Sequence, residues 1–238
     1  MEVIILAGGR GTRMSEETQS VPKPMVEING KPMLWHIMNI YASQGFKSFT
    51  IATGFLSHVI DIWSGSLKED WDVKTLFTGI DTQTGGRLKR CIENLRGDDF
   101  LATYGDGLAN VNLTELIRFH RRGGFAATLT AVRPPARFGS VELNGNHVSH
   151  FGEKSQADAG WINGGFFVLN RAVASLIAGD HEPLELGAFP RLVELSSLGG
   201  FTHFGFWQPV DTLREKMEME KYARMTPPPW LVPKTNNF

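Results

Sequence analysis

The sequence predicts an α/β fold in which a mainly parallel sheet carries helices on both faces, and three observations support this prediction. Apolar β-rich runs alternate with segments of helical periodicity over residues 1–133. The first of these runs leads directly into the glycine-rich loop Gly8–Thr12. After Pro134 the pattern changes to a hairpin and shorter strands. Strand–helix alternation is typical of doubly wound, Rossmann-like sheets, and here we expect a small β-rich part in addition.

The elements of the first half are marked by changes of periodicity. Apolar residues at Leu34, Ile37, Met38 and Tyr41 have helical spacing, and Gly45 ends that pattern. Runs rich in β-branched and aromatic residues are typical of strands. We expect strands at residues 2–7, 46–54, 72–79, 99–107 and 126–134, and helices at residues 33–45, 56–65, 87–97 and 113–124.

The second half begins with an expected hairpin over residues 138–154, with Asn144, Gly145 and Asn146 at its turn. We expect a strand at residues 160–170, a helix at 172–179, a further helix at 184–195 that contains a proline, a strand at 201–212 and a terminal helix at 213–225. No linker or internal repeat divides the chain, so we expect a single domain over residues 1–238.

Composition excludes several classes of protein. The formal net charge is −1, so the chain has no overall positive field for nucleic acid. The single cysteine, Cys91, excludes an internal disulfide and a cysteine-only metal site. We expect no membrane span, because the apolar runs are shorter than the ~20 residues required. The first run has no basic segment before it, so we expect a cytoplasmic protein without a signal peptide.

The loop after the first strand has the composition of an anion site. Glycines allow successive backbone N–H groups to point at one phosphate, and Arg10 and Arg13 add positive charge. Lys23 lies between two prolines that stiffen its loop. These residues match neither the Walker A nor the GxGxxG pattern. Taken alone they leave open a tight strand–helix turn with solvated cations.

Two aspartates follow expected strands far apart in the chain. Asp106 lies in TYGDG and Asp211 in WQPVDT. The carboxyl ends of strands in such a sheet lie at one ligand-binding edge, and two carboxylates there suit Mg²⁺ in phosphoryl transfer. An aspartate after a strand is more often a turn or cap residue, so spacing alone leaves both interpretations open.

The stretch LAGGRGTRM, followed by VPKPMVEINGKPML, resembles the signature of the sugar-1-phosphate nucleotidyltransferases. The stretches WHIMNIYASQG, TGGRLKR, TYGDGLANV, WINGGFFVLN and GFWQPVDTLREK resemble the glucose-1-phosphate cytidylyltransferase branch. The resemblance covers about residues 1–230 and implies a nucleotide-binding half at 1–133 and a sugar-phosphate-binding half at 134–238. We also expect a homo-oligomer, and the net charge and the short apolar runs predict that it binds neither nucleic acid nor membrane.

The resemblance implies roles for individual residues. Arg13 and Lys23 would be catalytic, and Asp106 and Asp211 would hold Mg²⁺ or Mn²⁺. The nucleotide, CTP, would be bound by Leu6, Ala7, Gly8, Gly9, Gly11, Thr12, Arg13, Lys23, Thr84, Gly85, Gly86, Arg87 and Asp106. The sugar 1-phosphate would be bound by Tyr104, Gly105, Glu153, Lys154, Asn163 and Gly164.

Three features depart from the family pattern. Ser155 stands where a proline usually follows the lysine, residues 54–84 look short, and residues 180–195 differ from the usual charged helix. These departures affect the expected oligomer and the sugar pocket.

The implied reaction converts CTP and α-D-glucose 1-phosphate into CDP-glucose and pyrophosphate. A phosphate monoester is already ionised at pH 7, so the reaction needs positioning and charge neutralisation rather than a general base. Three alternatives stay open at this point: another phosphorylated acceptor, another base such as that of UTP or dTTP, and an inactive regulatory subunit that senses nucleotide sugars.

Overall fold

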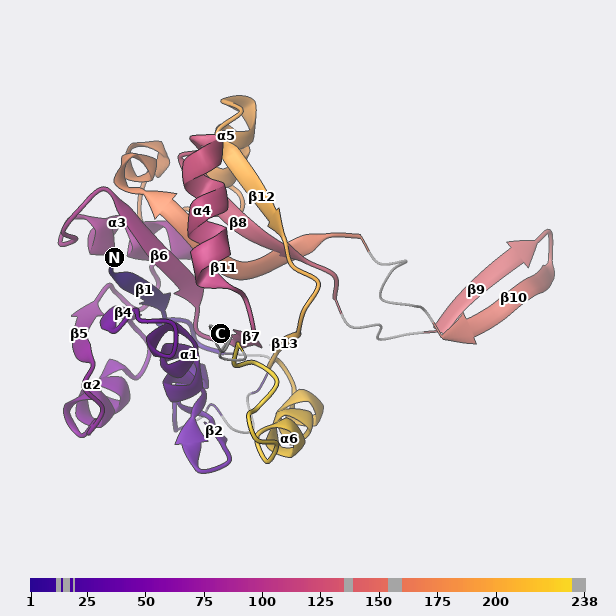
Figure 1. The fold of residues 1–238 in the computed structure, drawn as a ribbon, viewed down its shortest axis with the longest axis horizontal. Helices are drawn as coiled ribbons and strands as arrows, with labels where there is room; N and C mark the ends of the chain where they lie inside the picture. The colour runs from indigo at the N-terminus through magenta and orange to yellow at the C-terminus, as the bar shows by residue number, and fades with distance from the viewer. Residues whose placement is uncertain (12–13, 15–17, 19, 135–138, 154–159, 233–238) are drawn as a thin grey trace, which may run out of the picture.

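A seven-stranded sheet runs through the centre of the protein (Figure 1). The computed structural model describes residues 1–11, 14, 18, 20–134, 139–153 and 160–232. The strands lie in the order β12-β8-β11-β6-β1-β4-β5. Only β11 runs antiparallel to its neighbours in this sheet, so the predicted mainly parallel arrangement is confirmed. The bounds are β1 (Val3–Leu6), β4 (Ser48–Thr53), β5 (Asp72–Phe77), β6 (Asp99–Tyr104), β8 (Ala127–Val132), β11 (Ile162–Asn170) and β12 (Leu198–Thr202).

Helices cover both faces of the sheet, as the alternation of buried residues in the strands requires. Val3 and Ile5 of β1 belong to one buried cluster, and Ile4 and Leu6 belong to the other. The first cluster is covered by α1 (Met33–Ala42), α2 (Ser57–Gly65), α4 (Leu113–Gly123) and α6 (Leu213–Tyr222). The second is covered by α3 (Thr84–Ile92), α5 (Ala188–Glu194) and the 3₁₀ helix η3 (Arg171–Leu176).

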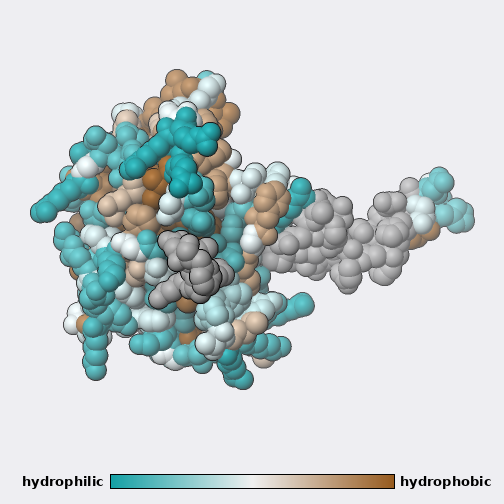
Figure 2. Space-filling view, in the orientation of Figure 1, coloured by the Kyte–Doolittle hydropathy of each residue, from teal (hydrophilic) through white to brown (hydrophobic). Residues whose placement is uncertain are grey.

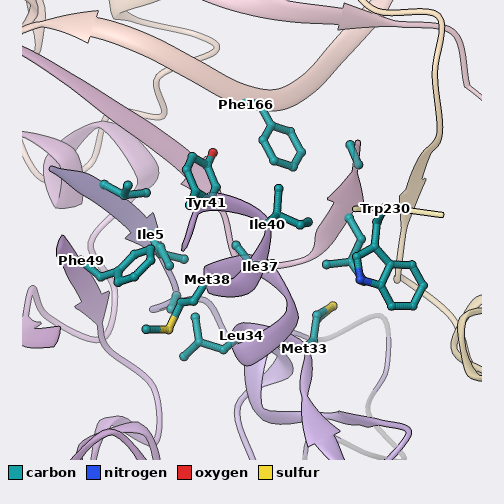
Figure 3. Close-up of a cluster of buried hydrophobic side chains, with 14 of the residues drawn as sticks. Ile5, Met33, Leu34, Ile37, Met38, Ile40, Tyr41, Phe49, Phe166 and Trp230 are labelled. Atoms are coloured by element: carbon teal, nitrogen blue, oxygen red, sulfur yellow. The ribbon is translucent and has the colours of Figure 1, made fainter. Parts of the chain in front are cut away.

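Helix α1 buries the apolar residues whose spacing predicted it. Leu34, Ile37, Met38 and Tyr41 are all fully buried, and Figure 3 shows them among the side chains of the first cluster. Tyr41 stacks on Phe166 of β11 with 6.0 Å between the ring centroids. Residues three and four apart share one face of a helix, so this stripe forms one buried face of α1 within the first cluster.

The second half departs from the expectations in two helices. The helix expected at 172–179 is the shorter η3. The helix expected from Leu184 begins at Ala188, and Pro190 lies in its first turn. A proline is tolerated there because the first backbone N–H groups of a helix have no partner within it.

Short two-stranded sheets complete the fold, and one of them contains part of a strand whose predicted bounds were wrong. The strand expected at 201–212 is divided into β12 and β13 (Trp207–Pro209), and β13 pairs with β7 (Gly107–Ala109). β2 (Glu27–Ile28) pairs with β3 (Lys31–Pro32). The predicted hairpin is confirmed as β9 (Gly139–Asn144) and β10 (His147–Glu153), which extends away from the central sheet in Figure 1.

The surface is mainly hydrophilic on the face shown in Figure 2, with hydrophobic residues gathered at the end where α5 lies. Val193 and Leu195, at the end of that helix, are each 62% exposed. Trp161 is 41% exposed, whereas Phe166 and Phe167 are buried. Within the described residues, no helix has the length and apolar character needed to cross a membrane.

Candidate active site

A cavity of about 380 Å³ lies at the carboxyl ends of β1 and β6. These neighbouring parallel strands occupy the middle of the sheet, where doubly wound folds bind ligands. Most of the nucleotide-binding residues predicted from the sequence meet here. The cavity is lined by Leu6, Ala7, Gly8, Gly9, Gly11, Lys23, Pro24, Thr82, Gln83, Thr84, Arg87, Tyr104, Gly105, Asp106 and Asp211.

The glycine-rich loop wraps one wall of the cavity. Gly11 has a φ of +62°, and a Cβ atom there would lie 2.9 Å from the Cβ of Lys23. Glycine therefore allows both the left-handed backbone and the close approach of Lys23. Arg10 is directed to Asp81, with 3.0 Å between Nη2 and Oδ1. The predicted ligands Thr12 and Arg13 lie outside the described residues.

Lys23 lies between the two predicted metal ligands. Its Nζ donates to Oδ2 of Asp106 at 2.9 Å and to Oδ1 of Asp211 at 2.5 Å. Only 11% of the Lys23 side chain is exposed, and it is held in the short η2 turn (Lys23–Met25), which follows Pro22 and contains Pro24. Three residues that are distant in the sequence thus form one cluster of charges on the cavity wall.

The pairing of β7 with β13 explains why the two aspartates meet. Asp106 directly precedes β7, Asp211 lies just beyond the end of β13, and the antiparallel pairing brings Gly107 opposite Pro209. The Val210 N–H then donates to the Asp106 carbonyl at 2.9 Å. The proximity of the aspartates is therefore set by backbone hydrogen bonds, and no local sequence signal marks it.

Asp211 is also fixed by the start of α6. Its backbone N–H donates to Oε2 of Glu215 at 2.8 Å, and the N–H of Thr212 donates to the same oxygen at 3.0 Å. The Thr212 hydroxyl in turn accepts from the Glu215 N–H, which completes a capping box. Glu215 is a supporting residue that was not predicted from the sequence, although the Thr-x-x-Glu pattern could have indicated it.

The electrostatics of this cluster favour a charged lysine. Burial alone would lower the pKa of Lys23, but the charges and hydrogen bonds of Asp106 and Asp211 outweigh it and raise the pKa above its usual value. Lys23 is therefore an ammonium at neutral pH. Among the described residues no group of three or more His, Cys, Asp or Glu is placed to hold a metal ion. Two convergent carboxylates with substrate phosphates do, however, provide the hard oxygen ligands that Mg²⁺ prefers.

Helix α3 places only part of the TGGR motif in the cavity. Thr84 lines the wall, but Gly85 and Gly86 face the segment around Asp180. A Cβ atom on Gly85 would lie 2.4 Å from the Glu182 carbonyl oxygen, and one on Gly86 would lie 2.6 Å from Cα of Asp180. Both glycines thus allow this close packing, and their predicted contact with the nucleotide stays a prediction. Thr82 and Gln83, which we had not predicted, line the cavity instead.

Arg87 also lines the cavity, and its guanidinium bonds to the protein. Its guanidinium donates to the carbonyl oxygens of Gly8, Thr53, Gly79 and Ile80 and to Oγ1 of Thr78, at 2.7 to 3.1 Å. Arg87 is only 4% exposed, and desolvation lowers its pKa from the ordinary value. Its terminal N–H groups thus bond to protein acceptors, and its predicted contact with the nucleotide stays a prediction.

The residues predicted to bind the sugar phosphate are partly brought together. Asn163 Nδ2 donates to the Tyr104 hydroxyl at 3.3 Å, and that hydroxyl donates to Glu185, a residue that we had not predicted. Burial first, and then the charge of Glu185, raises the pKa of Tyr104. Gly105 lies on the cavity wall, where a Cβ atom would lie 2.9 Å from Pro24.

Gly164 and Glu153 were also predicted to bind the sugar phosphate. Gly164 packs against β8, and its carbonyl oxygen accepts from Trp207 Nε1 at 2.8 Å. Glu153 ends β10, and its side chain, like all of Lys154, lies outside the description.

Comparison with known families agrees with the geometry. The family model described as nucleotidyl transferase matches residues 2–192. The chain belongs to the nucleotidyl transferase family. A glucose-1-phosphate cytidylyltransferase of Salmonella typhimurium is 43% identical over 97% of this chain and 98% of that protein. A probable glucose-1-phosphate cytidylyltransferase of Bacillus subtilis is 36% identical over 98% of this chain and 100% of its own length. The predicted branch of this nucleotidyl transferase family is thereby confirmed.

Solved structures support the same fold for this nucleotidyl transferase. HddC from Yersinia pseudotuberculosis superposes with a TM-score of 0.73 at 22% identity, over 94% of this chain and 99% of that one. An inositol-1-phosphate CTP transferase from T. maritima gives a TM-score of 0.67 at 17% identity, over 92% and 94% of the two chains. At these identities the likeness shows the fold alone.

Proposed function

We propose that this protein transfers the cytidylyl group of CTP to α-D-glucose 1-phosphate and forms CDP-glucose and pyrophosphate. The observation that carries the proposal is the cluster of Lys23, Asp106 and Asp211 on the wall of the cavity beside the glycine-rich loop. This cluster occurs in a chain that is 43% identical over 97% of its length to a glucose-1-phosphate cytidylyltransferase.

The chemistry is a substitution at the α-phosphorus of CTP. A phosphate oxygen of the sugar 1-phosphate attacks that phosphorus in line, and the bond to the oxygen that bridges the α- and β-phosphates breaks. Pyrophosphate leaves with the electron pair. The attacking monoester is already ionised at pH 7, so the protein needs to align two anions and neutralise their charge.

The nucleotide would lie along the glycine-rich loop. Backbone groups of Gly8, Gly9 and Gly11 bound the cavity there, and Arg13 follows them in the sequence. Lys23, which is an ammonium and packs against Gly11, would contact the phosphates and the departing pyrophosphate. This assignment uses positive charge where negative charge moves during the reaction.

The sugar phosphate would lie toward Tyr104 and Asn163, which are already joined by a hydrogen bond. Hydroxyl and amide groups of this kind bind sugar hydroxyls. Lys154 and Glu153 would complete the site, with the lysine on the phosphate and the glutamate on the hydroxyls, as the family resemblance implies.

Asp106 and Asp211 would hold Mg²⁺ or Mn²⁺. Their carboxylate oxygens already converge on a single cationic atom, Nζ of Lys23, so the residues fit a small hard cation that also binds phosphate. A bound divalent ion would supply charge neutralisation to the triphosphate. Within the protein, Lys23 would then bond to phosphate oxygens rather than to both carboxylates.

The test is a pyrophosphate-release assay of the purified protein with Mg²⁺. CTP, UTP, dTTP and GTP are each combined with glucose 1-phosphate, mannose 1-phosphate and a non-sugar phosphate monoester. We expect the highest kcat/KM with CTP and glucose 1-phosphate, and no turnover after chelation of the metal. A different preferred pair would overturn the substrate assignment, and nucleotide binding without turnover by any pair would indicate a regulatory protein.

A further inference from the structure

Arg87 joins the carboxyl ends of three adjacent strands. It extends from α3 and donates to the Gly8 carbonyl after β1, to the Thr53 carbonyl at the end of β4, and to the backbone of Gly79 and Ile80 after β5. β1, β4 and β5 are neighbours in the sheet. One buried side chain from a helix therefore fixes the relative positions of two loops that continue into the cavity wall.

The glycines at these strand ends make room for the guanidinium. A Cβ atom on Gly8 would lie 2.0 Å from Nη1 of Arg87, and a Cβ atom on Gly54 would lie 2.5 Å from the same nitrogen. A flexible side chain could move away from such a contact, but the guanidinium is held by five hydrogen bonds. The first glycine of the loop is thus required by Arg87, in addition to any contact with phosphate.

The bonding of Arg87 needs the planar guanidinium. Among the described residues, no carboxylate lies within ion-pair distance of Arg87, so carbonyl oxygens and one hydroxyl replace its hydration. Lysine has one ammonium with three donors and cannot reach acceptors spread along three strands. A buried cation whose hydrogen bonds are only partly made is costly, so the complete set is strongly preferred.

Both loops joined by Arg87 contribute to the cavity. Gly8 and Gly9 line it from the first loop, and Thr82 and Gln83 line it from the loop that follows β5. We propose that Arg87 is a positioning residue for the nucleotide: it sets the distance between these two loops and thereby the width of the slot that receives the base. The nucleotide part of this inference rests on the proposed function, whereas the bonding of Arg87 to Gly8 does not.

A double-mutant cycle tests the structural part without any substrate. Gly8→Ala, Arg87→Ala and the double variant are compared with the natural protein by thermal unfolding. In the natural background Gly8→Ala is expected to lower Tm strongly, because the new methyl group displaces the guanidinium. In the Arg87→Ala background the same change should have a much smaller effect, since the space is empty. Equal effects of Gly8→Ala in both backgrounds would overturn the inference.

Arg87→Lys tests the functional part, because it keeps the charge and loses most of the hydrogen bonds. KM for CTP is expected to rise about tenfold, by analogy with the loss of charged hydrogen bonds, while kcat changes less. The kcat/KM for CTP divided by that for UTP is expected to fall. Arg118→Lys is the matched control, because Arg118 makes an exposed ion pair with Glu115 on α4 and should keep natural kinetics.

The outcomes separate the inference from the proposed function. A folded Arg87→Lys variant with natural KM for CTP and natural base preference would overturn the positioning role. If the natural protein turns over no nucleotide, the proposed function fails, and binding of CTP measured by calorimetry still reports the effect of Arg87→Lys. Unchanged CTP affinity in that experiment would also overturn the positioning role.

Discussion

Replacing Asp106 and Asp211 one at a time should show how burial determines what each carboxylate contributes to stability. Asp211 is 18% exposed in its side chain, Asp106 is 42% exposed, and both bond to Nζ of the largely buried Lys23. Asp211→Asn removes the more buried charge and should destabilise the fold by about 2 kcal/mol, the range of a hydrogen bond to a charged group. Asp106→Asn should cost less than about 1 kcal/mol, because solvent screens the more exposed pair.

The same variants test whether one metal ion joins the two carboxylates. Each substitution should lower kcat strongly and raise the Mg²⁺ concentration needed for half-maximal activity. The double variant should lose much less activity than the product of the two single losses, because both residues serve one ion. The four proteins are compared by urea unfolding at pH 7 and by pyrophosphate release over a series of Mg²⁺ concentrations.

Two results would refute this reasoning. A stability loss for Asp106→Asn equal to or larger than that for Asp211→Asn would contradict the argument from burial. Strictly multiplicative losses of kcat, or full activity in excess chelator, would show that the two carboxylates do not hold one metal ion.

Other predictions follow from single sites. Lys23→Ala should lower kcat about 100-fold or more with the fold intact, as for other lost transition-state donors, and near-natural kcat would remove Lys23 from the site. Lys154→Ala should raise KM for glucose 1-phosphate far more than KM for CTP, and equal effects on both would contradict its assignment to the sugar phosphate. Gly86→Ala should lower Tm, because its methyl group would lie 2.6 Å from a backbone atom of the neighbouring segment, and an unchanged Tm would contradict that packing. Burial lowers the pKa of His36 and His120 in the folded protein, so the unfolded chain takes up protons first as the pH falls. The free energy of unfolding, measured with urea, should therefore fall below about pH 6.5, and replacing both histidines with Gln should reduce that slope.

Much of the fold could be predicted because its signals are local. The spacing of apolar residues in α1 and the glycines that follow several strands depend on one segment at a time. Asn112, whose residue type favours helix N-caps, accepts a hydrogen bond from the Glu115 N–H at the start of α4. The apolar period, the helix cap and the turn residues each depend on a few neighbouring positions in the sequence. Here these local signals agree with the tertiary structure.

The reasons for individual glycines could not be predicted, because they depend on distant neighbours. A glycine shows only that no Cβ atom is present, and the sequence does not show which group needs the space. For Gly8 that group is Arg87, 79 residues away, and for Gly86 it is the backbone of Asp180. The contact between Tyr104 and Glu185 spans 81 residues and likewise has no local signature.

The pairing of β7 with β13 has a consequence for synthesis on the ribosome. Lys23 is made early, but its partner Asp211 follows 188 residues later, which takes roughly 10 to 40 s at ordinary translation rates. Until β13 emerges, the nascent chain lacks one of the two carboxylates that bond to Lys23. The nascent chain therefore cannot form the complete cluster of Lys23, Asp106 and Asp211. The active site is completed late, after β13 and α6 have been synthesised and have packed against the rest of the protein.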